Sequence, residues 1–252
     1  MRTPRIRIVS RYKSLGPVVD RIRKEAEARG ITVNDKSYDV AIAVGGDGTM
    51  ISAAVGGKPV MTVRGGSKNH LLDIPQDRIG AAFDMLLAGK FKEERYSMLE
   101  VTARKKNVLA FNDIGITSIV PLPIGFTVSY LGTGFEASGD GVLVSTPQGS
   151  TGWSFSSNGT YLSHRSNVFL ISLLNPVMMP LRSVVIPQVP VRLEVDTKDH
   201  RDRATLVADG NIIIRLDDGE SVSVRKSRKE AVIYRFFEHE LMRTMLGNGS
   251  SL

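Results

Sequence analysis

Apolar positions in the first ninety residues follow two periods, one typical of buried strands and the other of amphipathic helices. Three short runs are apolar or β-branched nearly throughout, as in parallel strands that are covered on both faces. Between them, apolar side chains recur at helical spacing. The expected strands are residues 5–10, 39–44 and 59–63, and the expected helices are 16–29, 49–55 and 77–88. This alternation predicts a parallel sheet with helices on its faces.

The chain changes character at about Tyr96, where helical spacing gives way to short strand-like runs separated by Gly, Pro, Asn and Asp. Regular short strands with turn signals between them are typical of a β-sandwich. The expected strands are residues 99–103, 108–111, 125–130, 141–145, 184–186, 191–195, 205–208, 212–216 and 221–224. The run Asp217-Asp218-Gly219 has the composition of a hairpin turn between the last two strands.

A helical pattern returns over residues 236–246, and its apolar side is suited to pack back on the first domain. We therefore expect an α/β fold and an all-β fold in two domains. Residues 1–95, with 226–252 returning, form the first domain, a Rossmann-like parallel sheet with helices. Residues 96–225 form the second, a β-sandwich-like domain.

The composition excludes several classes of protein. Hydrophobic residues make up 42% and charged residues 23% of the 252 positions, which excludes disorder of the whole chain. The absence of cysteine excludes a disulfide scaffold, a cysteine-ligated zinc site and a thiol nucleophile, and it fits a cytoplasmic protein. No apolar run approaches the roughly 20 residues that span a bilayer, so we expect no membrane partner.

Positive charge is concentrated in the first domain. The chain has a formal charge of +7, and residues 1–95 hold 17 Lys and Arg against 11 Asp and Glu. Such an excess indicates either a solvated basic face or a polyanionic ligand, such as nucleotide phosphates, polyphosphate or nucleic acid. We expect no nucleic-acid partner, because the chain has no known nucleic-acid motif and does not interleave aromatic with basic residues.

The first chemical signal is Gly45-Gly46-Asp47-Gly48-Thr49, which follows an expected buried strand and opens a helix. Glycines let the chain turn sharply and let a ligand approach the backbone closely. The helix N-terminus beyond them offers unpaired N–H groups, which favour phosphate. Asp47 would lie beside that phosphate, suited to accept a hydroxyl proton or to hold Mg²⁺. The alternative is a glycine turn in which Asp47 only bonds the local backbone.

Two further segments carry polar groups at strand ends. Asn112 and Asp113 supply donors and acceptors that suit the two hydroxyls of a ribose, although a plain turn or cap has the same composition. Residues 139–156 combine glycines, hydroxyls and one proline. Small residues there would let a flat ring lie close to the backbone, with the hydroxyls reading its edge. The alternative for this run is a disordered linker, and Trp153 within it is expected in the core or at an interface.

The three segments, in this order, resemble the motifs of the NAD kinase family. That family has GGDGT, then an Asn-Glu pair, then a DGLxxSTPxGSTAY-like run, then an Asp-Gly pair that here is Asp209-Gly210. GGDGT alone is shared with diacylglycerol and sphingoid lipid kinases, whereas the later run is far more specific. The resemblance covers about residues 40–211.

The resemblance implies phosphoryl transfer from ATP, or from polyphosphate in some members, to the 2′-hydroxyl of the adenosine ribose of NAD, giving NADP. It implies Mg²⁺ supplied with the donor, and a homodimer or homotetramer in which a neighbouring subunit completes the site. Asp47 is then the expected catalytic base and a ribose contact. The other expected substrate contacts are Gly45, Gly46, Gly48 and Thr49 for the donor phosphates, Asn112 and Asp113 for ribose hydroxyls, Thr151, Gly152 and Ser156 for the adenine, Asp140 and Gln148 for the nicotinamide half, and Asp209, placed by its motif alone.

Several departures from the family pattern indicate a divergent, archaeal-type branch. Asp113 replaces the usual glutamate and is one methylene shorter. Residues 64–72 replace the usual GxLGFL segment, so an apolar-aromatic wall of the nucleotide pocket is expected to be missing or supplied differently. Residues 175–183 lack the usual Cys-Pro-His, and Trp153 stands where the family has tyrosine.

Two other functions stay open at this point. A lipid kinase of the GGDGT type is one, but residues 50–56 lack the Asn-Glu-Val-x-Asn-Gly continuation of such enzymes, and no amphipathic membrane-binding helix stands out. The other is a non-catalytic dinucleotide sensor on the same fold. The retained Asp47 disfavours a sensor, because catalysis needs that carboxylate and a sensor does not.

Overall fold

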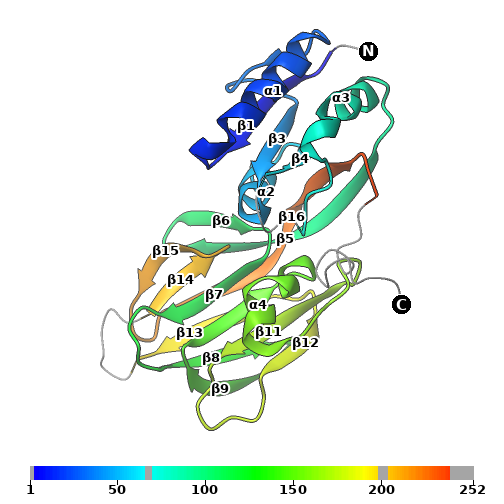
Figure 1. The fold of residues 1–252 in the computed structure, drawn as a ribbon. Coiled ribbons are helices and arrows are strands. Elements are labelled where there is room, and N and C mark those ends of the chain that lie inside the picture. Colours follow the sequence, from blue (N-terminus) through cyan, green and yellow to red (C-terminus); the bar gives the residue numbers. More distant parts are fainter. Residues whose placement is uncertain (1–2, 66–69, 198–203, 239–252) are drawn as a thin grey trace. The chain divides into compact units, whose positions relative to one another are not determined.

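The computed structural model describes residues 3–65, 70–197 and 204–238, which fall into two units (Figure 1). The first unit is made of Met1–Arg95 and Ala231–Leu252, and the second is Tyr96–Glu230. The second unit is therefore an insertion within the chain of the first. Two long strands, β5 (Lys92–Ala103) and β16 (Ser221–Arg235), contain the points at which the chain passes from one unit to the other.

A parallel sheet with helices forms the first unit, which confirms the fold expected from the alternating patterns. The strand order is β2-β1-β3-β4-β16, and every neighbouring pair is parallel. The strands are β1 Arg5–Ser10, β2 Thr32–Val33, β3 Val40–Gly45 and β4 Val60–Arg64. The helices are α1 Gly16–Glu27, α2 Asp47–Ala54 and α3 Ile79–Leu87, with 3₁₀ turns at Lys13–Leu15 and Gln76–Arg78.

Burial of apolar side chains and the backbone conformation of one glycine explain these elements. All six residues of β3 are buried, which is why this strand is apolar throughout. Ile22 of α1, Ile42 of β3 and Phe83 of α3 belong to one core cluster. Helix α1 ends before Gly30, whose φ of +67° suits the left-handed residue of a glycine cap. Within the described ranges, none of the helices is long and apolar enough to cross a membrane.

Two antiparallel sheets form the second unit, which confirms the expected β-sandwich-like fold. One sheet has the order β12-β11-β10-β7-β14-β15. The other contains β16-β13-β8-β9, with β5 paired to β16 and β6 paired to β5. The strands are β6 Lys106–Ala110, β7 Asp113–Ser118, β8 Ile124–Tyr130, β9 Thr133–Gly139, β10 Gly141–Ser145, β11 Val168–Leu174, β12 Ser183–Pro187, β13 Val191–Asp196, β14 Ala204–Ala208 and β15 Asn211–Leu216. Phe126 of β8 and Phe169 of β11 pack in one core cluster, so both sheets contribute to it.

Several elements differ from the sequence-based expectation. The expected strands omit β2, β7, β9 and β11, and the short helix α4 (Trp153–Asn158) is not predicted. The expected β5 and β16 are too short. Residues 217–219 do form a turn, but it joins β15 to β16, which lie in different sheets, so the expected hairpin is wrong. The helix expected over 236–246 lies outside the described residues from 239 onward, and 236–238 are not helical.

Candidate active site

The GGDGT motif forms the turn between β3 and α2, at the carboxyl end of the parallel sheet. Gly45 has φ +151°, a conformation that side chains disfavour, and a Cβ there would lie 2.7 Å from the Thr49 hydroxyl. Helix α2 begins at Asp47, two residues before the expected start, and its N-cap Gly46 supplies no side-chain bond. A helix start without a side-chain cap is a favourable place for an anion, because the helix dipole and backbone N–H groups point toward it.

Two more groups favour a phosphate at this helix start. The Thr49 hydroxyl is buried and has no hydrogen-bond partner among the described residues. The Arg11 Nη1 lies 3.9 Å from the position that a Cβ on Gly48 would take. An unpartnered hydroxyl and a cation beside a helix N-terminus are groups that bind phosphate oxygens. Sequence reasoning missed Arg11, whose only signal is its place directly after β1.

The Asp47 carboxylate is held by a distant segment of the first unit. The Leu71 N–H donates to Oδ1 at 2.9 Å, and the His70 N–H donates to Oδ2 at 3.3 Å. These bonds span 24 and 23 residues, so tertiary structure orients Asp47 and a purely local turn does not explain it. A carboxylate accepts up to about four hydrogen bonds, so this arrangement is compatible with a substrate hydroxyl as a further donor.

In the second unit, Asp209 binds the backbone of the turn that carries Asn112 and Asp113. Its carboxylate accepts the N–H groups of Phe111 at 2.8 Å, Asn112 at 2.7 Å and Asp113 at 3.3 Å. Asp209 has φ +47° and Gly210 has φ +73°, so the two form the tight turn between β14 and β15. The motif alone places Asp209 near a ligand. The structure adds that its carboxylate fixes the Asn112–Asp113 backbone.

Asp113 is a buried carboxyl group, with 2% of the residue exposed, and its Oδ1 has no partner among the described residues. Burial, and next the negative charge of Asp209, raise the pKa of Asp113 to about 7. Burial also raises the pKa of Asp209, although its three N–H donors lower it. In the described chain the Asn112 Oδ1 is likewise buried and unpartnered. Two such oxygens on one turn suit a ligand that donates hydrogen bonds, such as a ribose.

Asp113 should make the stability of the protein depend on pH near neutrality. Its pKa of about 7 lies above the ordinary 3.8, so its contribution to stability is complete below pH 3.8 and is lost as the pH rises through 7. We expect the free energy of unfolding, relative to that of Asp113→Asn, to fall by about 2 to 3 kcal/mol between pH 5 and pH 8. Urea unfolding of both proteins at the two pH values measures this change, and a constant difference would contradict it.

The loop after β10 packs on Asn112. The Thr146 N–H donates to the Asn112 carbonyl at 2.8 Å. A Cβ on Gly149 would lie 2.1 Å from that carbonyl oxygen, and one on Gly152 would lie 3.3 Å from the Asn112 Nδ2. Close approach to Asn112 therefore requires these small residues, so contact with a ligand ring is not the only reason for glycine here. The alternative of a disordered linker is wrong, because Gln148–Thr151 form a 3₁₀ turn that leads into α4.

The other expected residues of this loop differ in exposure. Gln148 is buried, and its Nε2 donates to the carbonyls of Ser97 and Phe111, both at 2.8 Å. This amide thus supports the loop from inside the second unit. Ser156 is exposed on α4. Trp153, on the same helix, is 41% exposed, so it is not a core residue of this chain, and its place at an interface stays a prediction.

Asp140 lies at the other end of β10 from these groups. Ser145, the last residue of β10, is paired with Asp113, whereas Asp140 precedes the first residue. At about 3.3 Å per residue, the strand separates Asp140 from Ser145 by roughly 16 Å. Asp140 is exposed, and its Oδ2 accepts the Asn175 Nδ2 at 2.6 Å. The residues that the second unit does bring together are Asn112, Asp113, Gln148, Gly149, Gly152 and Asp209.

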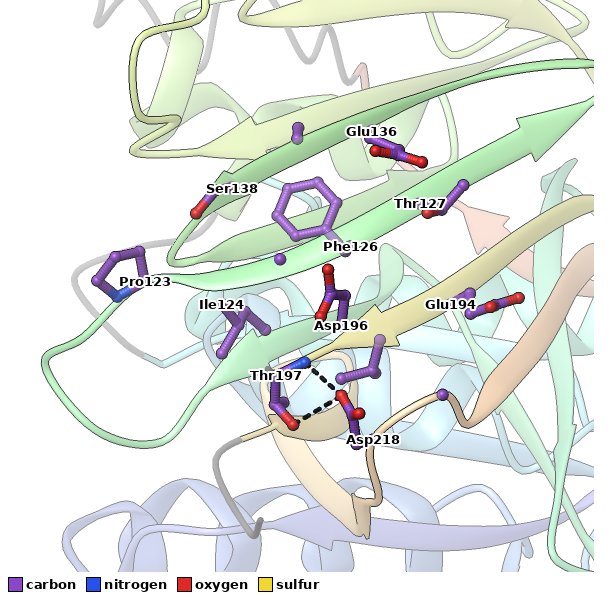
Figure 2. Close-up of a pocket in the computed structure, with 14 residues that line it drawn as sticks. Pro123, Ile124, Phe126, Thr127, Glu136, Ser138, Glu194, Asp196, Thr197 and Asp218 are labelled. Carbon is purple, nitrogen blue, oxygen red and sulfur yellow. Dashed lines mark hydrogen bonds between the residues drawn. The ribbon is translucent and has the colours of Figure 1, made fainter. Parts of the chain in front are cut away.

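A pocket of about 710 Å³ in the second unit is lined by none of the expected site residues (Figure 2). Strands β8, β9 and β13 and the turn before β16 form its walls. Figure 2 shows Glu136, Glu194, Asp196 and Asp218 around it, and Asp218 accepts the Thr197 hydroxyl at 2.9 Å. Four carboxylates give this pocket the wrong charge for a phosphate-bearing substrate. We therefore do not assign a nucleotide to it.

Comparison with known proteins identifies the family. Models of the ATP-NAD kinase N-terminal and C-terminal domains match residues 10–91 and 111–236. The NAD kinase of Saccharolobus islandicus is 37% identical over 243 residues, which cover 96% of this chain and 98% of that protein. Yeast NADH kinase, solved with NADH, has a similar fold, with a TM-score of 0.88, 16% identity, and 99% of this chain and 89% of that chain covered. An NAD kinase from Archaeoglobus fulgidus, solved with ATP, has a TM-score of 0.81 at 22% identity, covering 96% and 97%. The chain belongs to the NAD kinase family.

Proposed function

We propose that this protein transfers a phosphoryl group from ATP, or from polyphosphate, to the 2′-hydroxyl of the adenosine ribose of NAD, giving NADP. The observation that carries the proposal is the start of α2. There, a helix start without a side-chain cap, the buried Thr49 hydroxyl and the Asp47 carboxylate lie within three residues of chain. The relatives of Saccharolobus and Sulfurisphaera, which are named NAD kinases, support the same reaction.

In the proposed mechanism, Asp47 orients the 2′-hydroxyl and accepts its proton as the oxygen attacks the terminal phosphorus of the donor. The bond from that phosphorus to the leaving phosphate oxygen breaks as the new P–O bond forms. The α2 amides and the Arg11 guanidinium hold the donor phosphates and stabilise the developing charge. Mg²⁺ enters with the donor as part of the substrate. The described residues arrange no group of three or more carboxylates or histidines that would hold the ion by themselves.

The second unit supplies the dinucleotide contacts in this proposal. Asn112 and Asp113 bind ribose hydroxyls through their unpartnered oxygens, which lie on a turn fixed by Asp209. Asp113 is shorter than the glutamate of the family, and its carboxyl group is buried, with the charge of Asp209 helping to raise its pKa. The adenine lies against the loop of Thr151, Gly152 and Ser156.

An oligomer completes the site in the same proposal. Asp140 is expected at the nicotinamide half, yet a whole strand separates it from the Asn112–Asp113 turn of its own chain. A homodimer or homotetramer would let a neighbouring copy present its Asp140 to the same NAD molecule. Trp153, exposed on α4, is the residue that we expect at that contact. Light scattering of the purified protein measures the oligomer size.

A cytoplasmic location is proposed on composition, since the chain has no cysteine that an oxidising compartment would pair. The two alternative functions, a lipid kinase and a non-catalytic dinucleotide sensor, are not favoured. The relatives at 32% to 38% identity over most of the chain are named NAD kinase, and neither a lipid kinase nor a sensor is among those names. A sensor also does not need an oriented carboxylate such as that of Asp47, which two backbone amides hold in place.

The direct test is NADP formation by the purified protein with NAD, Mg²⁺ and either ATP or polyphosphate, detected with an NADP-specific dehydrogenase. We expect NADP with at least one donor, and the active donor identifies the second substrate. Folded protein that binds NAD but forms no NADP with either donor would contradict the proposal and favour a sensor. Folded protein that neither forms NADP nor binds NAD would contradict it in favour of a different acceptor.

A further inference from the structure

We propose that Arg235 is a positioning residue for Asp47, acting through the buried segment Leu71–Ile74 without touching substrate. The inference rests on the proposed function, because it assumes that Asp47 is the base. It starts from the two amides that hold the Asp47 carboxylate, those of His70 and Leu71. These amides orient the carboxylate only if their own segment is fixed.

Contacts with β4 fix one end of that segment. Residues 71–74 are each at most 3% exposed. The Ile74 N–H donates to the Thr62 carbonyl at 3.0 Å, and the Arg64 N–H donates to the Ile74 carbonyl at 2.9 Å. The Thr62 hydroxyl donates to Asp73 Oδ1 at 2.7 Å. Ile74 therefore forms a parallel bridge with Val63 of β4. The bridge does not extend back to the carbonyls of residues 71 and 72, which need other donors.

Two arginines supply those donors. Arg64 Nε donates to the Leu72 carbonyl at 3.0 Å. Arg235, the last residue of β16, donates from Nη1 to the Leu71 carbonyl at 2.7 Å. An unpaired carbonyl buried at this depth would be costly, so the guanidinium has a clear role as its partner. Leu71 is thereby bonded on both sides, with its carbonyl on Arg235 and its N–H on the Asp47 carboxylate.

The Arg235 guanidinium is itself held by the buried Asp73 and the partly buried Glu94. Only 4% of its side chain is exposed. Its Nε donates to Glu94 Oε2 at 2.9 Å, and its Nη1 lies 3.4 Å from Asp73 Oδ1. The other Asp73 oxygen accepts the N–H groups of Phe236 at 2.9 Å and Phe237 at 3.2 Å. These bonds hold the planar guanidinium in one orientation. A substitution at residue 235 should therefore displace Leu71 first, and should affect Asp47 only through Leu71.

The test is a double-mutant cycle of Arg235→Lys with Asp47→Asn, read as kcat and KM for NADP formation. Lysine keeps the charge beside Asp73 and Glu94 but cannot reproduce the fork of the guanidinium. We expect Arg235→Lys to lower kcat about tenfold in the wild-type background, with both KM values within about twofold. In the Asp47→Asn background it should lower kcat less than about twofold, because the base through which it acts is gone.

A control variant and a measurement that does not depend on activity distinguish the positioning of Asp47 from a general loss of stability. Arg29→Lys is the matched control, since Arg29 bridges Glu25 and Asp84 in the same unit and does not contact the segment. It should leave kcat within about twofold. Amide hydrogen exchange at His70 and Leu71 should be faster in Arg235→Lys and unchanged in Arg29→Lys.

The outcomes distinguish this inference from the proposed function. Equal losses of kcat in both Asp47 backgrounds, an unchanged or raised kcat, or unchanged exchange at Leu71 would each overturn the positioning role. A wild-type protein that forms no NADP would overturn the proposed function instead, and the exchange measurement would still test the link from Arg235 to Leu71.

Discussion

Replacing Asp47 with asparagine should lower the turnover of NADP formation at least about 100-fold, the usual scale for the loss of a positioned base. Asparagine has the same shape and keeps one oxygen that accepts the Leu71 N–H, so the turn and the helix start should persist. What it loses is the ability to take the proton of the 2′-hydroxyl. NAD binding should therefore change by no more than a few-fold.

Steady-state kinetics and NAD titration by calorimetry measure both parts of this prediction. Asp84→Asn is the matched control, because Asp84 lies in the same unit and its carboxylate pairs with Arg29 on the surface. That variant should keep normal turnover. Near-normal turnover in Asp47→Asn would remove Asp47 from the catalytic role. A large loss of NAD affinity together with turnover would make it a binding group instead.

Replacing Asp209 with alanine should raise the KM for NAD at least about tenfold. Three backbone N–H groups, at residues 111 to 113, lose their common acceptor in that variant. Leaving a buried donor unsatisfied costs about 1 to 3 kcal/mol, so the turn will rearrange to find other partners. A rearranged turn no longer presents the Asn112 and Asp113 oxygens together. Turnover at saturating NAD should fall less than the KM rises, because Asp47 is unchanged.

Asparagine at position 209 should have an intermediate effect. Its single oxygen can still accept the N–H groups of Asn112 and Asp113, but its NH₂ group faces the Phe111 N–H. Loss of the negative charge should also lower the pKa of Asp113, since that charge is the second cause of its rise. The KM should thus increase in the order wild type, Asp209→Asn, Asp209→Ala, with the pH dependence of unfolding shifted toward acid in both variants.

The control for Asp209 is Asp218→Ala, which removes another carboxylate that accepts a backbone N–H group in the second unit. Asp218 accepts the Thr197 hydroxyl and N–H beside the acidic pocket (Figure 2). We expect some loss of stability and an unchanged KM for NAD. A KM that rises equally in Asp218→Ala and Asp209→Ala would show that general destabilisation, and not the Asn112–Asp113 turn, sets the affinity.

The sequence predicts the first unit well because its signals are local. The buried strand before GGDGT is apolar at every position, and glycines mark the ends of α1 and α3. The start of α2 is predicted two residues late, because Gly48 within a helix looks like a loop residue. Residues 64–72 replace the segment that supplies an apolar-aromatic wall of the nucleotide pocket in the family. Leu71 and Leu72 of this stretch are buried, and 66–69 lie outside the described residues.

The second unit shows where pattern reasoning fails. Strand β7 begins at Asp113 and contains Gly115, a combination that disfavours a strand on propensity alone. A Cβ on Gly115 would lie 2.1 Å from the Val142 carbonyl, so glycine is required there by the neighbouring strand. Nothing local in the sequence shows that approach. The bonds from Asp209 to residues 111–113 likewise join positions almost a hundred apart, and only the fold brings them together.

The insertion of the second unit reverses the usual order in which a chain assembles its domains. A ribosome that has reached residue 230 has made all of the second unit, whereas the first unit still lacks its part of β16 and Arg235. At 5–20 residues per second, the inserted stretch takes roughly 10 seconds to emerge. During that interval Val60 of β4 has no β16 residue to pair with, and the Leu71 carbonyl lacks its Arg235 donor. The second unit can therefore fold first, and the support of the Asp47 carboxylate is completed only when the end of β16 has been synthesised.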